Sequence, residues 1–552
     1  MMRTHALGSA TFLATALLLA APAAADRVVT QDGRVLTPKK VKPQGEGYLL
    51  VFESGEITLS DKSQVKAVEI EGDMSDYVPQ NEDEKKKLEQ GYVRYQGKWL
   101  SKPAYEDVLR SEHAKSRARA DDLAAHSNFH NAWSKDTKHF TVVTNTSPEL
   151  LDYYAELLEA YYDVMDARFK IKLSPSLRRT RMTVNIYKSR REFHKLNKLG
   201  AGGGVAGYFY PGDQTLNFYH DYQEPAITDW VALHEGTHLL TYLIDPQYIP
   251  QIWLNEAVAD YFGSAEIRRD KKGRLEIEPG RLQTDRVLTV QQAIQDGKDI
   301  ALDDLFTISR NDFEAFEYAH AWSFVYFLNQ SSPRYKKAFD RFFKDLYTLK
   351  KGVEYEIVNY ADKSGTGKIV PPAEIRRVVL DSLGNPDVKA LDKEWKEFIA
   401  AIPIEGPQAR FKRGSRAVFF GEMFAETMEE TKRNAEAART DLDAAIEGGV
   451  RDARAWWARS KVRVVQGEMN GAREDLDKAI ELDPLNATYR FDKGMMLSGI
   501  TVIGGDGMPD LDDDTLGKEK NPEAKEWFGL AAELAPENDF FRRVHERFQA
   551  SE

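Results

Sequence analysis

The chain has 552 residues, too many for one hydrophobic core, so we expect roughly three or four domains. Its 76 basic and 88 acidic residues give a net charge of -12, and no long basic stripe is interleaved with aromatic residues, which argues against a nucleic-acid partner. The absence of cysteine excludes disulfides, thiolate metal ligands and a cysteine nucleophile. Any metal must therefore be held by histidine and carboxylate side chains.

The first 25 residues have the pattern of a cleaved secretory signal. Arg3 precedes an apolar run over residues 10–21, and three alanines at 23–25 form a small-residue cleavage site ahead of Asp26. The run is too short to span a bilayer, and no later segment approaches about 18 uncharged apolar residues, so we expect no stable membrane anchor. The sequence thus predicts an exported protein, periplasmic or extracellular, whose mature chain begins at Asp26.

Two regions precede the part of the chain that carries chemistry. Residues 26–72 contain short β-rich runs separated by turn signals, which is typical of a small β-barrel or sandwich. Residues 73–133 combine a charged linker, a hairpin that turns at Gln96-Gly97 and a charged helix over 104–125. We interpret this second region as a spacer or adaptor.

Residues 134–404 are predicted to form an α+β domain. A strand over 139–144 is followed by Ser147, a helix N-cap, and by a helix with apolar residues at 3.6-residue spacing. A second strand covers 182–187, and a hairpin pairs 207–210 with 215–219. From residue 226 onward the pattern is mainly helical.

Residues 414–552 contain an internal repeat. The segment 441–446 recurs at 475–480, a period of 34 residues from Leu442 to Leu476, which is the tetratricopeptide (TPR) spacing. A further match of 481–486 with 533–538 is offset by 52 residues, so we expect an insertion between residues 499 and 521. The pattern predicts three TPR-like helical hairpins that could bind a protein partner.

The segment from His234 to His238 carries the clearest chemical signal. On a helix, two histidines four residues apart lie on one face and can hold one metal ion. Glu235 beside them is placed to take a proton from a water molecule at that metal. Gly236, between the histidines, predicts that another backbone approaches this helix closely.

Glu256 is the expected third ligand, because a catalytic zinc needs three protein ligands and one open position. Pro246 and Pro250 break the chain after a first helix over 228–243, and a second helix is predicted over 253–264. Glu256 can return to the metal across this helical hairpin. Asp260, one turn later on the same face, could accept the outward N–H of His234 and fix its tautomer.

The HExxH motif at 234–238 followed by NExxxD at 255–260 resembles the gluzincin zinc peptidases, the group that includes thermolysin and the aminopeptidase N type. The chain looks most similar to the bacterial peptidase-MA-like proteins, over residues 138–327. The resemblance implies a thermolysin-like catalytic domain with a mixed sheet and a helical subdomain. It also implies one Zn²⁺ ion held by His234, His238 and Glu256, with Glu235 as the general base.

Two further features follow from comparison with the aminopeptidase N type. There a tyrosine on a later helix stabilises the oxyanion, and Tyr318 matches its position; a buried helix tyrosine is the alternative, and His320 is a weaker candidate. The Gly-x-Met-Glu-Asn strand that holds a free amino terminus is missing, and residues 204–208 stand in its place. This departure favours an endopeptidase, with the strand 215–219 pairing to an extended substrate.

Other features are interpreted as structural. His220 lies near the metal helix but is expected to be a surface residue at a strand end. The acidic run at 510–514 lacks the glycine and terminal glutamate of an EF-hand loop, so we expect a solvated loop rather than a calcium site. Trp456 and Trp457 are expected to pack inside the repeat helices.

Taken together, the motifs predict an exported zinc-dependent metallopeptidase that acts on a peptide or protein substrate. The alternative is a non-catalytic scaffold or binding protein in which a peptidase fold is retained and the TPR-like repeats act. No residue that the chemistry needs is visibly lost, which favours the enzyme.

Overall fold

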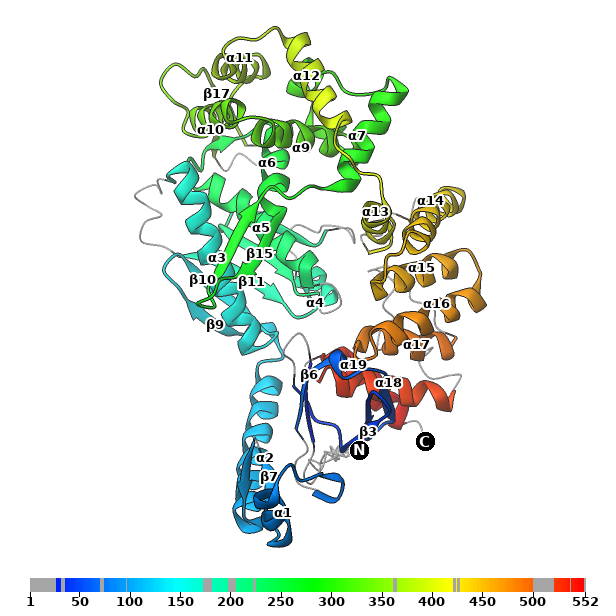
Figure 1. The fold of residues 1–552 in the computed structure, drawn as a ribbon. Helices are drawn as coiled ribbons and strands as arrows, with labels where there is room; N and C mark the ends of the chain where they lie inside the picture. Colours follow the sequence, from blue (N-terminus) through cyan, green and yellow to red (C-terminus); the bar gives the residue numbers. More distant parts are fainter. Residues whose placement is uncertain are drawn as a thin grey trace, which may run out of the picture. The chain divides into compact units, whose positions relative to one another are not determined.

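The computed structural model describes residues 26–30, 35–69, 74–95, 97–171, 181–196, 205–221, 225–360, 365–419, 423, 427–499, 521–536 and 538–550 (Figure 1). The predicted secretory signal and the acidic run at 510–514 lie outside these residues. Among the residues described, no helix combines the length and the apolar character that crossing a membrane requires. The fold mixes helices with several small sheets, as the predicted α+β class requires.

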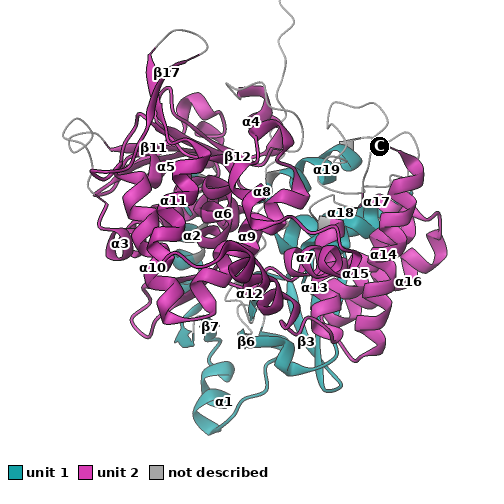
Figure 2. Ribbon diagram, turned by 90° about the horizontal axis from the view of Figure 1, so that it is seen from above, with its two compact units in different colours: residues 1–120, 484–494, 521–552 teal, residues 121–483, 495–520 magenta. Residues whose placement is uncertain are grey.

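The chain divides into two compact units (Figure 2). The first comprises Met1–Ala120, Pro484–Gly494 and Asn521–Glu552, and the second comprises Asp121–Asp483 and Met495–Lys520. The first unit therefore combines segments from the beginning and the end of the chain. All residues of the predicted metal centre belong to the second unit.

The first unit contains two three-stranded antiparallel sheets, in the orders β2-β1-β6 and β3-β4-β5. Val28, Leu50 and Ile57 are buried, whereas the residues on either side of each are more exposed, as expected for strands with one covered face. The strands are β1 (Arg27–Thr30), β2 (Val35–Leu36), β3 (Lys40–Gln44), β4 (Gly47–Val51), β5 (Glu56–Leu59) and β6 (Val65–Glu69). They are followed by α1 (Glu82–Glu89), β7 (Val93–Tyr95), β8 (Lys98–Leu100) and the beginning of α2 (Lys102–Ala125).

A five-stranded sheet begins the second unit, in the order β12-β13-β11-β10-β9. The three central strands are parallel, and the strand at each edge is antiparallel to its neighbour. The strands are β9 (Trp133–Asp136), β10 (Phe140–Thr144), β11 (Met182–Tyr187), β12 (Gly207–Tyr210) and β13 (Thr215–Tyr219). Helix α3 (Pro148–Phe169) follows β10, and the Ser147 side chain accepts the N–H of Leu150 at its start, as predicted.

Three helices of the second unit build the predicted metal centre and its surroundings. They are α5 (Pro225–Tyr242), α6 (Ile252–Gly263) and α9 (Ala315–Gln330). Helix α5 packs on β12 and β13, α6 packs on α5, and α9 packs on α6. Trp253 of α6 and Trp322 of α9 are completely buried in this layer, so the helices are fixed by a continuous apolar core.

The remaining elements up to residue 400 surround this core. They are α4 (Arg190–Leu196), β14 (Tyr248–Ile249), β15 (Ala265–Arg269), β16 (Leu275–Pro279), α7 (Thr284–Asp296), α8 (Leu302–Thr307), α10 (Pro333–Tyr347), β17 (Glu356–Asn359), β18 (Thr366–Ile369), α11 (Pro372–Leu383) and α12 (Val388–Ala400). Helix α7 packs against α9 and α12.

The C-terminal helices pack as pairs, α13 with α14, α15 with α16 and α18 with α19. They are α13 (Pro407–Phe419), α14 (Met428–Glu447), α15 (Ala453–Val465), α16 (Met469–Leu482), α17 (Ala487–Leu497), α18 (Pro522–Leu534) and α19 (Asp539–Ala550). Leu442 and Leu476, at equivalent repeat positions, are both completely buried, and Trp456 and Trp457 are buried as expected. The first of these helices, α13, begins at Pro407 and already pairs with α14.

Candidate metal centre

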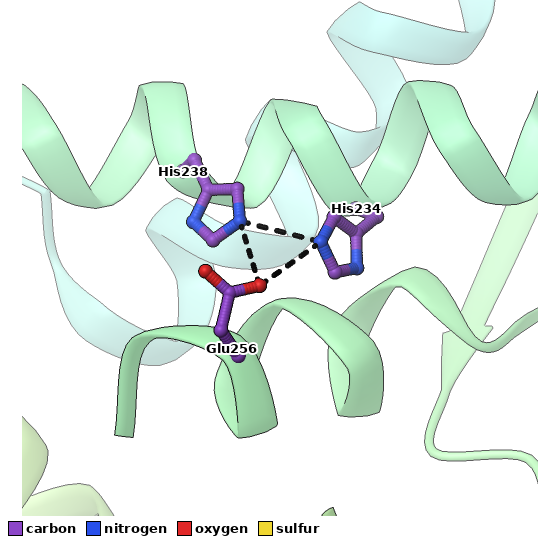
Figure 3. A group of neighbouring side chains, drawn as sticks. All are labelled: His234, His238 and Glu256. Carbon is purple, nitrogen blue, oxygen red and sulfur yellow. Dashed lines mark hydrogen bonds and ion pairs between the residues drawn. The ribbon is translucent and has the colours of Figure 1, made fainter. Parts of the chain in front are cut away.

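Helix α5 brings two imidazoles to one point. The Nε2 atoms of His234 and His238 lie 3.3 Å apart, and both side chains face α6 (Figure 3). This is the arrangement expected for histidines one helical turn apart. The ring of His234 is nearly buried and that of His238 is partly buried, so the pair is largely shielded from water.

Glu256 reaches the same point from α6. Its Oε2 lies 3.6 Å from the Nε2 atom of His234 and 3.6 Å from that of His238. Figure 3 shows the carboxylate directed from α6 toward the two rings on α5. The helical hairpin thus brings together the three residues that the sequence predicts as ligands.

The close approach of the two helices depends on Gly263. A Cβ atom at this position would lie 3.0 Å from the backbone nitrogen of His234 and 3.1 Å from its Cα. At Gly236, in contrast, an added Cβ would meet only the ring of Tyr161, at 3.7 Å. The expectation that a backbone approaches Gly236 is therefore wrong: the backbones meet at Gly263, on the other helix.

The three donor atoms fit a metal ion. A tetrahedral zinc with ligands at about 2.0–2.1 Å separates neighbouring donors by about 3.3–3.4 Å, close to the distances observed here. Two imidazole nitrogens and one carboxylate oxygen are also a donor set that divalent metals prefer. The group His234, His238 and Glu256 can therefore hold a metal ion.

The same proximity shifts the pKa values of His234 and Glu256. Burial alone lowers the pKa of His234, but the carboxylates of Asp260 and Glu256 outweigh it and raise that pKa to about 10. Burial would raise the pKa of Glu256, yet the two histidines hold it well below its usual value. A metal ion must therefore compete with a proton for His234.

Asp260 lies behind His234. Its Oδ1 is 3.1 Å from Nδ1 of His234, and its side chain is completely buried. The other oxygen, Oδ2, is 2.5 Å from Nη2 of Arg286 at the start of α7. The structure places Asp260 beside Nδ1 of His234; that this carboxylate fixes the tautomer of the ring stays a prediction.

Glu235 faces the edge of the sheet. Its Oε2 accepts a hydrogen bond from the backbone N–H of Phe209 in β12, at 3.0 Å. That N–H therefore points away from β13 and lies on the outer edge of the sheet. The predicted pairing of a substrate with the strand 215–219 is wrong, because this strand, β13, is hydrogen-bonded to β12 on one side and β11 on the other.

Tyr318, on α9, lies beside the third ligand. Burial, together with the negative charge of Glu256, raises the pKa of Tyr318 well above its usual value. His320, the weaker candidate, is completely buried: its Nδ1 is 2.8 Å from the carbonyl oxygen of Phe316, and its ring packs edge-on against Trp395. This environment is that of a core histidine.

His220 is not a surface residue, contrary to expectation. Its side chain is only 6% exposed, and its Nδ1 lies 2.7 Å from the hydroxyl of Tyr154. Burial lowers the pKa of His220 to about 4, so the ring is neutral near pH 7. A histidine at the end of a strand is often solvated, but here Tyr154 of α3 covers the ring of His220.

Three residues at this centre have no clear sequence signal: Phe209, Gly263 and Arg286. Phe209 contributes a backbone N–H, Gly263 allows the two helices to approach closely, and Arg286 is a buried cation. For Gly263 the sequence offers a weak local signal, because a glycine at the end of a predicted helix can mark close packing. Phe209 and Arg286 have no such signal. The chain matches no protein-family model, no curated protein and no solved structure with which it was compared.

Proposed function

We propose that this protein is an exported zinc-dependent metallopeptidase of the gluzincin type that its motifs resemble. The observation that carries the proposal is the triangle of donors from His234, His238 and Glu256, with Glu235 on the same helix and facing the sheet edge. The donor set matches zinc, and Asp260 behind His234 matches the outer carboxylate typical of such sites.

Zinc in this centre would act as a Lewis acid that polarises water and the scissile carbonyl. Glu235 would be the general base and then the general acid. Because Phe209 anchors one of its oxygens, the other oxygen can take a proton from water and deliver it to the leaving amine. Tyr318, which stays protonated because its pKa is raised, would donate a hydrogen bond to the developing oxyanion.

An extended substrate would add to the outer edge of β12, which pairs with no other strand in the part of the chain that the structure describes. Along β12, the backbone N–H and C=O groups point alternately toward β13 and toward the outer edge. Because the N–H of Phe209 points outward, the backbone groups of Gly207 and Phe209 lie on the outer edge. The N–H of Phe209 is already bonded to Glu235, so a peptide would pair with the other outward groups of Gly207 and Phe209 and would pass the carboxylate of Glu235. The proposed binding mode is β-strand addition. The sequence lacks the Gly-x-Met-Glu-Asn strand that holds a free amino terminus in the aminopeptidase N type, which favours an endopeptidase.

The C-terminal helices would serve as the second functional part. Their pairwise packing and the 34-residue spacing of buried leucines support TPR-like repeats, which typically bind a protein partner on an extended surface. In the scaffold alternative these repeats are the only active part of the protein. The two proposals differ in whether Glu235 has a chemical role.

The decisive experiment measures zinc content and the hydrolysis of a broad library of quenched peptides by the wild type and Glu235→Gln. We expect one zinc per chain in both, and hydrolysis that falls about 10²–10⁴-fold in the variant, because it loses its general base. Glu278→Gln, at an exposed glutamate of β16, is the matched control. Zinc-loaded protein that cleaves no peptide would support the scaffold, and undiminished hydrolysis by Glu235→Gln would rule out the proposed mechanism.

A further inference from the structure

The first turn of α7 lies behind the metal centre and presents a buried cation to it. Arg286 is 9% exposed, and its Nη2 contacts Oδ2 of Asp260 at 2.5 Å. Its Nε donates to the side-chain oxygen of Gln283 at 2.8 Å. The guanidinium is thus held in one orientation by two partners, a geometry that its rigid planar fork allows and a lysine cannot reproduce.

This turn is itself anchored on both sides. Gln283, the residue before α7, donates from Nε2 to the hydroxyl of Ser264 at 2.6 Å, just beyond the end of α6. Asp285, adjacent to Arg286, is paired at 2.7 Å with Arg416 of α13. The turn that carries Arg286 is therefore tied both to the helix of Glu256 and to the first C-terminal helix.

We infer that Arg286 is a positioning residue for the metal centre. It fixes the carboxylate plane of Asp260, and Asp260 in turn fixes the imidazole of His234. The same guanidinium lies over the ring of Tyr318, 5.6 Å from its centre, so it also contacts the residue beside Glu256. As far as it concerns a bound metal, this inference rests on the proposed function.

The competing explanation is that Arg286 merely neutralises a buried carboxylate and stabilises the fold. The two explanations differ in how Arg286 and Asp260 combine. If Arg286 acts through Asp260, replacing Arg286 has no further effect on metal affinity once Asp260 has been replaced. If Arg286 only stabilises the fold, replacing it leaves the metal affinity of the folded protein unchanged.

The test compares Zn²⁺ affinity, measured by competition with a chromogenic chelator, and the absorption spectrum of the Co²⁺-substituted protein. We expect Arg286→Met to bind Zn²⁺ about 10–100-fold more weakly and to change the Co²⁺ spectrum, because His234 loses its fixed orientation. Arg286→Lys, which restores a charged donor, should recover part of the loss. Arg281→Met, at an exposed arginine paired with Glu266, is the matched control and should bind like the wild type.

Asp260→Asn and the double variant Asp260→Asn/Arg286→Met complete the test and remain informative if Arg286→Met does not fold. Equal affinity of these two supports the inference, and a further loss in the double variant overturns it. Wild-type affinity in folded Arg286→Met also overturns it and leaves the proposed function intact. If the wild type binds no Zn²⁺, the metal centre and this inference fail together. If affinities change as expected but no peptide is cleaved, only the proposed peptidase activity fails.

Discussion

The backbone N–H of Phe209 donates to the carboxylate of Glu235, and this bond of 3.0 Å joins the edge of the sheet to the metal-binding helix. Its consequence is that the general-base candidate is oriented by a strand rather than by a neighbouring side chain. Val231, one turn earlier on α5, packs so closely on the same strand that a Cβ at Gly207 would lie 2.5 Å from it. Strand and helix are therefore in direct contact along the proposed substrate edge.

Phe209→Pro removes this donor while leaving the side of β12 that pairs with β13 unchanged, since proline is tolerated where an edge N–H points outward. We expect kcat for peptide hydrolysis to fall about 10–100-fold, because a hydrogen bond to a charged group contributes about 1.5–3 kcal/mol. Zinc content should not change. Phe209→Ala keeps the N–H and is the control; an equal loss of kcat in both variants would assign the effect to the side chain.

Zinc binding should release protons. With a pKa of about 10, His234 is protonated at pH 7 in the metal-free protein, and only its neutral form binds metal. Apparent affinity should therefore rise by about tenfold per pH unit between pH 7 and 9. Calorimetry in buffers of different ionisation enthalpy measures the release directly. Binding heats that are independent of the buffer would show that His234 is already neutral.

Gly263→Ala places a methyl group against the backbone of His234, where the nearest atoms would be 3.0 and 3.1 Å away. We expect the free energy of unfolding to fall by about 1–3 kcal/mol, because the packed helices must separate. Gly236→Ala is the paired control: its methyl meets only the Tyr161 ring at 3.7 Å, so improved helix propensity of about 0.5–1 kcal/mol should leave stability equal or higher. Urea unfolding of both variants decides between these outcomes.

In the first unit, Glu533 of α18 accepts the backbone N–H groups of Glu53 and Ser54 at 3.0 and 2.9 Å. This carboxylate joins a turn near the beginning of the chain to a helix near its end. Glu533→Ala should lower the free energy of unfolding of this unit by about 1–3 kcal/mol, with a smaller loss in Glu533→Gln. Amide hydrogen exchange at Glu53 and Ser54 should accelerate in the variants, and unchanged exchange would contradict the role of Glu533.

Elements with short-range signals could be predicted from the sequence to within a few residues. Helix α5 and helix α6 follow from apolar periodicity and flanking prolines, and the hairpin of β12 and β13 follows from its turn. The distances among His234, His238 and Glu256 follow the same logic, since helical spacing places the first two and a helical hairpin returns the third. Local geometry is sufficient where residues are close in sequence.

Only the tertiary structure decided three features: which strand lies at the sheet edge, the close contact of Gly263 with the backbone of His234, and the pairing of Asp260 with Arg286. Strand order depends on pairings between distant segments, and these place β13 inside the sheet and β12 at its edge. Arg286 reaches Asp260 from another helix, and Tyr154 covers His220 from α3. The sequence by itself determined which side chains form the candidate centre, because residue type and helical spacing are local. The residues that support the centre and the strand that borders it depend on long-range packing, which leaves no periodic pattern in the chain.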